Sequence, residues 1–342
     1  MNERTAVAAP GGRQAAPDLA SLTAPVRDEM ERAETLLRAL LDSPHPFLRA
    51  VAGHMERFRG KRLRPAILLL SARAWGNGSD LACELAAIVE TIHLASLCHD
   101  DVLDGAELRR AAPTLNAQWG TQTAVMTGDL LLSRAFERLA QFGDLRLVQA
   151  LGQVGRMICE GELLQIGSRF NPGLRESDYL ALAEKKTGAL FGAAARLGVL
   201  AAGAGEADAE RMGAFGRHLG CAFQIVDDCL DVTGVEASAG KSLGADLRNG
   251  ELTLPVIHLL RTAEPARRTE LLELLQAGHA ERRHHRLRAL VASSDAVSYA
   301  LGVARRELHS ARQLILFLPP TAAREALLGF PEYILARSGS AE

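Results

Sequence analysis

The chain has 342 residues, of which 48% are hydrophobic, enough for one large domain or two ordinary ones. Its 39 lysines and arginines nearly balance its 41 aspartates and glutamates, which leaves a formal charge of -2. This balance excludes nucleic acid as a general partner, so any strong electrostatic site must be local. The 5 cysteines are scattered without a CxxC pair, which predicts buried free thiols in a reducing cytoplasm.

The N-terminal residues 1–24 are rich in alanine, proline and glycine and lack the apolar stretch of a signal peptide, so we expect this segment to be disordered. From residue 25 onward, apolar residues recur at the spacing of amphipathic helices, and strand-like alternation is nearly absent. Glycine, proline and capping residues separate roughly ten or more such segments. The sequence therefore predicts a single all-α domain over residues 25–342, built as one large helical bundle.

A basic run, RFRGKRLRP, follows the first helical segments at residues 57–65. Lys61 and Arg64 are three residues apart, so they share one face of a helix. Taken alone, such a run is typical of a solvated face or of a patch that binds an anionic surface.

The next notable segment is LCHDDVLDGAELRR, at residues 97–110. Asp100 and Asp104 are four residues apart and lie on the same helix face, whereas Asp101 is turned about 100° away. The neighbouring residues are apolar, so this acidic group stands on a helix that otherwise resembles a core helix. A solvated helix end is the alternative explanation for one such cluster.

A second acidic segment, QIVDDCLD, repeats the same spacing with Asp227, Asp228 and Asp231. Six carboxylates on apolar helices are costly unless a positive charge compensates them. Oxygen ligands without histidine or cysteine indicate a hard cation such as Mg²⁺, which often joins a few carboxylates to substrate phosphates. A nuclease or dinuclear carboxylate site is the next alternative, but a ferritin-like di-iron bundle needs Glu-x-x-His pairs, and neither cluster contains one.

Between the two acidic segments lies the longest apolar stretch, GALFGAAARLGVLAAGAG, at residues 188–205. It contains Arg196 and many small residues, so we interpret it as a helix buried within the protein and expect no transmembrane segment. Arg109 and Arg110 follow the first acidic cluster, Lys241 follows the second, and the segment EKKTG adds Lys186. Metal-bound carboxylates on one side and forked guanidinium donors on the other suit a diphosphate ligand.

The sequence resembles the trans-isoprenyl diphosphate synthases, the polyprenyl synthetase group of the class I isoprenoid synthases. The resemblance runs from about Arg57 to Arg337 and rests on GKRLRP, IHLASLCHDDVLD, LRR, KKTGALF, FQIVDDCLD, GKSLGADL and TLP, in the family's order. It implies the isoprenoid synthase fold with a central cavity, and a Mg²⁺-dependent prenyltransferase. The implied substrates are isopentenyl diphosphate and an allylic diphosphate, and the implied assembly is a homodimer.

The resemblance implies a role for each matching position. The metal ligands, holding three Mg²⁺ ions around the allylic diphosphate, would be Asp100, Asp101, Asp104, Asp227, Asp228 and Asp231. The residues that grip the same diphosphate would be Arg109, Lys186 and Lys241. The residues that hold isopentenyl diphosphate would be Lys61, Arg64, His93 and Arg110. Thr187 and Gln224 would place oxygen dipoles near the developing allylic cation, whereas His99 receives no direct role.

Product length depends on what blocks the hydrocarbon tunnel. Five residues before Asp100, about 7.5 Å down the helix, stands Ala95 with Ser96 beside it. Short-chain members of the family carry an aromatic residue near this point, so a methyl group leaves the way open to Ile92 and Ile88. We expect a medium- or long-chain product that supplies quinone side chains. Alternatives are a geranylgeranyl diphosphate synthase, a terpene cyclase, a non-catalytic subunit, or simple helix packing at Ala95.

Three positions depart from the family pattern. Arg59 precedes Gly60 where many members have a second glycine, and Ala111 stands where many have glycine. Glu251 in NGELTLP stands where many members carry lysine, which removes a cation near the diphosphate. The six aspartates are intact, so the sequence predicts an active enzyme.

Overall fold

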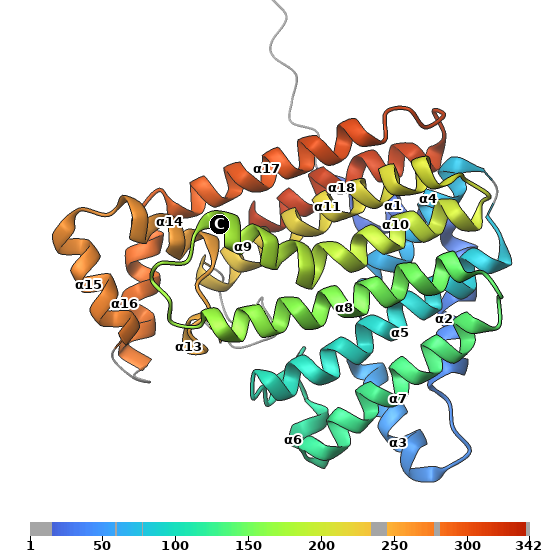
Figure 1. The fold of residues 1–342 in the computed structure, drawn as a ribbon, viewed down its shortest axis with the longest axis horizontal. Coiled ribbons are helices and arrows are strands. Elements are labelled where there is room, and N and C mark those ends of the chain that lie inside the picture. The colour runs from blue at the N-terminus through green and yellow to red at the C-terminus, as the bar shows by residue number, and fades with distance from the viewer. Residues whose placement is uncertain (1–15, 59, 77, 234–244, 277–280, 340–342) are drawn as a thin grey trace, which may run out of the picture.

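The computed structural model describes five segments of the chain, namely residues 16–58, 60–76, 78–233, 245–276 and 281–339 (Figure 1). Helices dominate these segments, which confirms the all-α prediction. The strands in the described part of the chain are β1 (Leu108–Arg109) and β2 (Ala112–Pro113), which pair antiparallel directly after the first acidic cluster.

The elements of the N-terminal half are α1 (Leu19–Thr23), η1 (Ala24–Val26), α2 (Arg27–Leu41), α3 (Pro46–Met55), η2 (Glu56–Phe58), α4 (Leu63–Trp75), α5 (Asp80–Leu103), α6 (Leu115–Trp119), α7 (Thr121–Ala140) and α8 (Leu145–Ser168). Those of the C-terminal half are α9 (Glu176–Ala183), η3 (Glu184–Gly188), α10 (Ala189–Ala201), α11 (Glu206–Thr233), α13 (Ala245–Arg248), α14 (Leu254–Thr262), α15 (Pro265–Gln276), α16 (Glu281–Ala292), α17 (Ala296–Leu314) and α18 (Ala322–Gly339). Many of these helices begin at a residue that caps them. The hydroxyl of Ser79, for example, accepts a hydrogen bond from the Ala82 amide at the start of α5.

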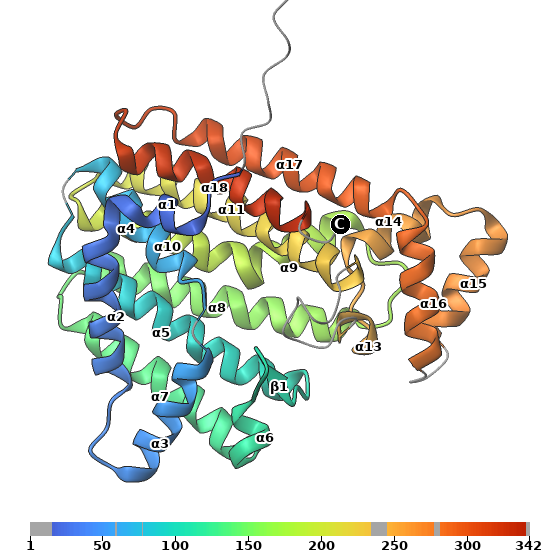
Figure 2. The same ribbon diagram turned by 180° about the vertical axis from the view of Figure 1, so that it is seen from behind.

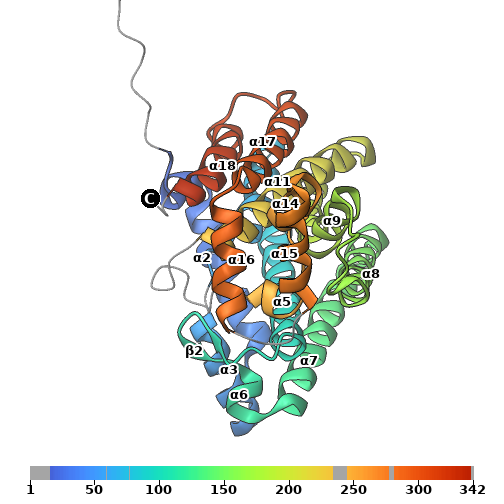
Figure 3. The same ribbon diagram turned by 90° about the vertical axis from the view of Figure 1, so that its left-hand side faces the viewer.

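The long helices run roughly along one axis and form layers across it. Helices α17 and α18 cover one side of α10 and α11, while α7, α6 and α3 lie beyond α5 on the opposite side (Figures 1 and 2). Seen along this axis, α5 and α11 lie in the middle of the bundle, and the α15–α16 hairpin closes the end nearest the viewer (Figure 3). The two helices that carry the acidic clusters are therefore both interior helices.

Helix α10 is the small-residue helix expected from the sequence, and it is buried among its neighbours. A Cβ atom on Gly198 would collide with the Leu68 carbonyl oxygen of α4. A Cβ atom on Gly216 of α11 would likewise collide with the Phe191 carbonyl oxygen. Glycine at these positions lets three helix backbones approach closely, and the prediction of a protein-buried helix is confirmed.

The structure corrects one boundary. The segment expected to be disordered extended to residue 24, but residues 19–23 form α1, because the Asp18 carboxylate accepts a hydrogen bond from the Ser21 amide and caps the helix. Leu22 of this helix is buried in the main core, whose members extend along the chain as far as Ile334. Residues 1–15 lie outside the described part of the chain.

Of the described helices, α5 alone is long and apolar enough to cross a membrane by length and composition. Within the protein, 72% of its most apolar window is buried, as expected of a core helix. All 5 cysteines are free thiols, and four of them are buried. The expectation of burial is wrong for Cys159, which is exposed on α8.

Candidate active site

The first acidic cluster lies at the C-terminal end of α5, where Asp104 is the last capping residue. Asp101 is buried and is turned toward the β1–β2 hairpin, where the Arg109 guanidinium lies 2.7 Å from its Oδ1 atom. Asp100 and Asp104 face another set of charges, which includes Lys186 and Glu162. The cluster is thus divided, and Arg109, expected to grip a diphosphate, is paired with Asp101 in this structure.

The second cluster lies near the C-terminal end of α11, and its members are held by different partners. Asp228 is buried and accepts two hydrogen bonds, from the Tyr179 hydroxyl at 2.6 Å and from the Gln224 amide at 2.7 Å. Asp227 pairs with Arg337 of α18 at 2.6 Å. Asp231 is also buried. These contacts fix the carboxylates of α11 from both α9 and the C-terminal helix.

Burial disfavours the charged form of one aspartate in each cluster. Burial raises the pKa of Asp100 to about 7, and the nearby Glu162 carboxylate adds to this rise. Burial also raises the pKa of Asp228 to about 7, although the hydrogen bonds from Tyr179 and Gln224 oppose the rise. A cation bound at these oxygens would restore the charged forms.

Arg64 connects the two clusters electrostatically. Burial lowers the pKa of its guanidinium to about 10, and the negative charges of Glu90, Asp227 and Asp100 oppose this fall. Arg64 therefore interacts with one aspartate from each acidic helix, and its guanidinium lies over the Phe191 ring at 4.6 Å. The acidic ends of α5 and α11 thus border the same part of the interior.

Arg64 and Arg110, two of the residues expected to bind isopentenyl diphosphate, form with Arg109 a cationic group around His93. Burial, followed by the charges of Arg64, Arg109 and Arg110, holds the pKa of His93 well below its usual range, so the imidazole is neutral. Several guanidinium groups that converge on one neutral ring make a site suited to an anion. Lys61 lies outside this group and is exposed, with its ammonium 5.5 Å from the Tyr333 ring.

Lys186 and Thr187 lie in η3, a single π-helical turn between α9 and α10. Such turns are rare and often mark functional sites. The Lys186 ammonium lies 2.8 Å from Glu162 and donates to Gln165 at 2.7 Å. The Thr187 hydroxyl donates to the Gln224 side-chain oxygen at 2.6 Å, so Thr187, Gln224 and Asp228 form one hydrogen-bonded chain.

Sequence reasoning missed several contributors to this site. Tyr179 has no local signal, because its role depends on a hydrogen bond to a residue 49 positions away. Burial and the Asp228 charge raise its pKa, so the phenol remains a donor. Glu162 and Arg337 have no local signal either, and they pair with the predicted site residues Lys186 and Asp227. Lys241 and Arg59 lie outside the described residues.

The three residues expected to set product length have different surroundings. Ile92 belongs to the main core, whereas Ala95 belongs to a smaller apolar cluster with Ala124 and Leu131 of α7. Ser96 is half-buried, and its hydroxyl donates to the His93 carbonyl oxygen at 2.9 Å. Their part in product length stays a prediction.

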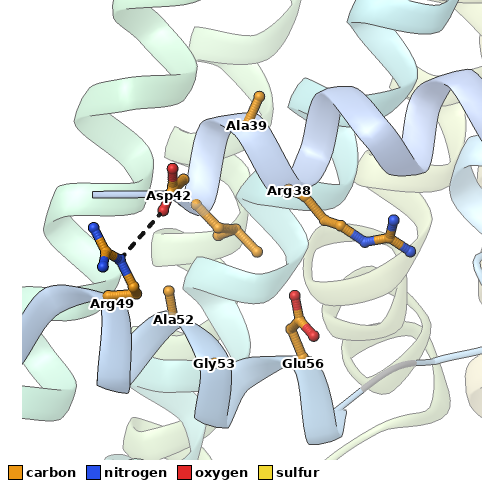
Figure 4. A pocket seen from close by; sticks show the side chains of 8 residues that line it. Arg38, Ala39, Asp42, Arg49, Ala52, Gly53 and Glu56 are labelled. Atoms are coloured by element: carbon orange, nitrogen blue, oxygen red, sulfur yellow. Dashed lines mark ion pairs between the residues drawn. The ribbon is translucent and has the colours of Figure 1, made fainter. Parts of the chain in front are cut away.

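A surface pocket between α2 and α3 is separate from this site (Figure 4). Its lining includes Arg49 and Asp42, which pair at 4.0 Å, together with Arg38 and Glu56. It contains none of the predicted site residues.

Within the described ranges, no three His, Cys, Asp or Glu side chains are arranged to hold a metal ion by themselves. The donor chemistry nevertheless fits Mg²⁺, because this ion keeps several waters and takes phosphate oxygens as ligands. Carboxylates with pKa values raised by burial also favour a bound cation.

Comparison with known proteins identifies the architecture. The sequence model of the polyprenyl synthetase family matches residues 45–292. The chain belongs to the polyprenyl synthetase family. It is therefore a prenyltransferase with the isoprenoid synthase fold, as the sequence resemblance implied.

Relatives of this polyprenyl synthetase align along most of its length. The octaprenyl diphosphate synthase of Haemophilus influenzae is 32% identical over 88% of this chain and 91% of its own. The heptaprenyl diphosphate synthase component 2 of Geobacillus stearothermophilus is 37% identical over 90% of this chain and 95% of its own. The polyprenyl synthase of Caulobacter crescentus, solved with calcium and isoprenyl diphosphate, superposes with a TM-score of 0.90 at 32% identity, covering 95% and 99% of the two chains.

Proposed function

We propose that this chain is an all-trans polyprenyl diphosphate synthase that adds isopentenyl diphosphate head-to-tail to an allylic diphosphate. The observation that carries the proposal is the common environment of Arg64, which interacts with Asp100 of α5 and Asp227 of α11. Carboxylates for metal-bound diphosphate thus border the cationic group around His93. Two adjoining anion sites are what a condensation of two diphosphates requires.

In the reaction, the allylic C–O bond breaks, the double bond of isopentenyl diphosphate attacks the resulting cation, and a proton is lost. Mg²⁺ held by the six aspartates, three ions in the complete site, would neutralise the charge that develops on the departing diphosphate. Lys186 adds a fixed positive charge beside Asp100. Arg64, Arg110 and His93 orient isopentenyl diphosphate, and the released diphosphate accepts the proton.

The hydrogen-bonded side chains of Thr187, Gln224 and Asp228 also stabilise the allylic cation in this reaction. Thr187 donates its proton to Gln224, so the lone pairs of its hydroxyl oxygen remain available near the reacting carbons. Gln224 in turn donates to Asp228, which fixes the orientation of its amide. These dipoles are set before the substrate arrives, and they stabilise an allylic cation without forming a covalent bond.

The product is a medium- or long-chain polyprenyl diphosphate of the kind that supplies quinone side chains. Two observations support this length: the methyl side chain of Ala95 before the first acidic cluster, and relatives named octaprenyl and heptaprenyl diphosphate synthases. Geranylgeranyl diphosphate synthesis is the enzymatic alternative. The second alternative is that the chain is a non-catalytic subunit, since one relative is named as component 2 of a heptaprenyl diphosphate synthase.

The enzyme is cytoplasmic and acts as a homodimer. Met126 of α7 and Leu163 and Leu164 of α8 are 62%, 69% and 54% exposed. Helices α7 and α8 are neighbours, and exposed large apolar side chains on neighbouring helices are compatible with a protein interface. We place the second subunit against α7 and α8.

The test of this function is an assay of the purified chain alone with farnesyl diphosphate, isopentenyl diphosphate and Mg²⁺, followed by mass analysis. We expect products longer than geranylgeranyl diphosphate, and we expect Ala95→Phe to shorten them because the ring would close the tunnel. If overpacking at Ala95 prevents folding, Ser96→Phe at a half-buried position is the substitute variant for the same test.

The matched control is Leu97→Phe, whose side chain is turned about 200° from that of Ala95 and should leave product length unchanged. Geranylgeranyl diphosphate as the longest product of the unmodified chain would favour the shorter-chain alternative. No incorporation would favour the subunit alternative, and an unchanged product distribution in both variants would refute the assignment of the tunnel wall.

A further inference from the structure

The end of α8 and the loop before α14 are in direct backbone contact, although they are about 80 residues apart in the chain. The Phe170 amide donates to the Gly250 carbonyl oxygen at 2.7 Å. Phe170 adopts a left-handed backbone conformation with φ of 56°, which is costly for an aromatic residue. A Cβ atom on Gly250 would overlap the Phe170 ring, so the close approach requires glycine. The relative position of residues 169 and 251 is therefore fixed by the backbone.

At this junction the Arg169 guanidinium pairs with Glu251, with 2.9 Å between Nη2 and Oε1. The pair is shielded from solvent, because the two side chains are 27% and 13% exposed. The Arg169 Nη2 atom also lies 3.9 Å from Asp104 Oδ1, so Arg169 joins Glu251 to the first acidic cluster. Glu251 thus occupies a position where it holds a cation instead of supplying one.

Arg169 has donors left over after these contacts. A guanidinium carries five N–H groups, and the pair with Glu251 uses only part of them. Its Nε atom is buried and has no hydrogen-bond partner in the described part of the chain. An unpaired buried donor is costly in a purely structural ion pair, but it is expected in a site that awaits an anionic ligand.

The surroundings of Asp104 indicate which ligand this would be. Among the described residues, the charges that act on Asp104 include those of Glu251, Lys186, Glu162 and Arg169. Arg169 and Lys186 therefore approach the first acidic cluster from two different helical segments. A diphosphate held at Asp104 through metal ions would lie within reach of both cations, and guanidinium groups bind phosphate oxygens in a forked geometry.

We propose that Arg169 is a diphosphate-binding residue of the allylic site and that Glu251 is the residue that positions it. The proposal rests on the proposed function and deepens it, because it names a cation of this chain that binds the allylic diphosphate. Glu251 orients the guanidinium toward Asp104, and the N–H groups on the exposed part of the Arg169 guanidinium contact the diphosphate.

The experiment measures the dissociation constant of farnesyl diphosphate with Mg²⁺ by titration calorimetry, together with the KM of each substrate. Arg169→Gln should weaken farnesyl diphosphate binding roughly tenfold, as expected for a charged hydrogen bond, and leave the KM of isopentenyl diphosphate unchanged. The double variant Arg169→Gln/Glu251→Lys should return the dissociation constant to within about threefold of the unmodified value, because lysine at 251 supplies the missing cation.

The control is Arg175→Gln, which removes an exposed arginine paired with Asp178 at 2.9 Å shortly after the junction and should leave both substrate affinities unchanged. Thermal unfolding of each variant checks the fold. Glu251→Gln, which weakens the hold on Arg169 without supplying a cation, should weaken farnesyl diphosphate binding less than Arg169→Gln does. Unaltered binding by Arg169→Gln would overturn the proposal. So would failure of the double variant to recover, since a purely structural pair predicts that result.

The proposal and the proposed function can fail separately. An unmodified chain that binds and extends farnesyl diphosphate, with an Arg169→Gln variant that binds it equally well, would leave the function intact and remove Arg169 from the site. An unmodified chain that does not bind farnesyl diphosphate would refute the function, and the role of Arg169 would fall with it.

Discussion

Asp100→Asn is expected to lower kcat by at least about a thousandfold, equivalent to about 4 kcal/mol of transition-state stabilisation. Asparagine preserves the shape of the side chain but removes the negative charge that attracts the metal ions. Burial and the Glu162 carboxylate raise the pKa of Asp100 to about 7, although Lys186 and Arg109 oppose the rise. A bound cation should therefore stabilise its charged form. Steady-state kinetics with saturating substrates and Mg²⁺ measures the loss, and binding of Mg²⁺–pyrophosphate should weaken in parallel.

The matched control for this variant is Asp80→Asn, at the other end of the same helix. Asp80 is 88% exposed and pairs with Arg32 at the surface. Its replacement should leave kcat within about twofold of the original, because surface ion pairs contribute little. A loss of less than about tenfold in Asp100→Asn would show that the first cluster does not hold the ions that drive ionisation.

Glu90→Gln is expected to destabilise the protein by about 3 kcal/mol, the usual cost of breaking a buried ion pair. Glu90 is buried in α5 and accepts a hydrogen bond from Arg62 at 2.7 Å, while Arg62 also donates to Glu34 at 3.1 Å. Arg62 has a left-handed backbone with φ of 52°, and its contacts hold this conformation at the start of α4. Urea unfolding followed by circular dichroism measures the change.

The same substitution should affect one substrate selectively. Arg62 lies between Lys61 and Arg64, so loosening its backbone displaces two residues assigned to isopentenyl diphosphate. The KM for isopentenyl diphosphate should rise more than that for farnesyl diphosphate. Asp80→Asn again provides the control, with a stability change within about 1 kcal/mol. A Glu90→Gln protein as stable as the original would mean that the pair contributes no net stability.

The sequence contained enough information for the fold class and for the two acidic clusters. Helical spacing, capping residues and the small-residue helix α10 are local patterns, and each determines local structure directly. That the two clusters share one ligand stays a prediction, and it rests on the cost of identically spaced carboxylates on two apolar helices. The N-terminal boundary failed because composition alone does not reveal the capping hydrogen bond from Ser21 to Asp18.

The partners of the site residues could not be inferred in the same way. The Arg109–Asp101 pair depends on the turn at β1–β2, and the Tyr179–Asp228 hydrogen bond joins separate helices. The sequence also did not reveal which apolar cluster each of the product-length residues joins. Residues three apart differ by about 60° around a helix, which is enough to place Ile92 and Ala95 in different apolar clusters.

The central claim is that the acidic ends of α5 and α11 together bind one metal-bound allylic diphosphate. The most direct measurement is a crystal structure of the chain with Mg²⁺ and a thiolo analogue of farnesyl diphosphate, which resists ionisation. We predict that the diphosphate of the analogue lies between Asp100 and Asp104 on one side and Asp227 and Asp228 on the other. A diphosphate bound to one helix alone, or bound away from both, would contradict the account.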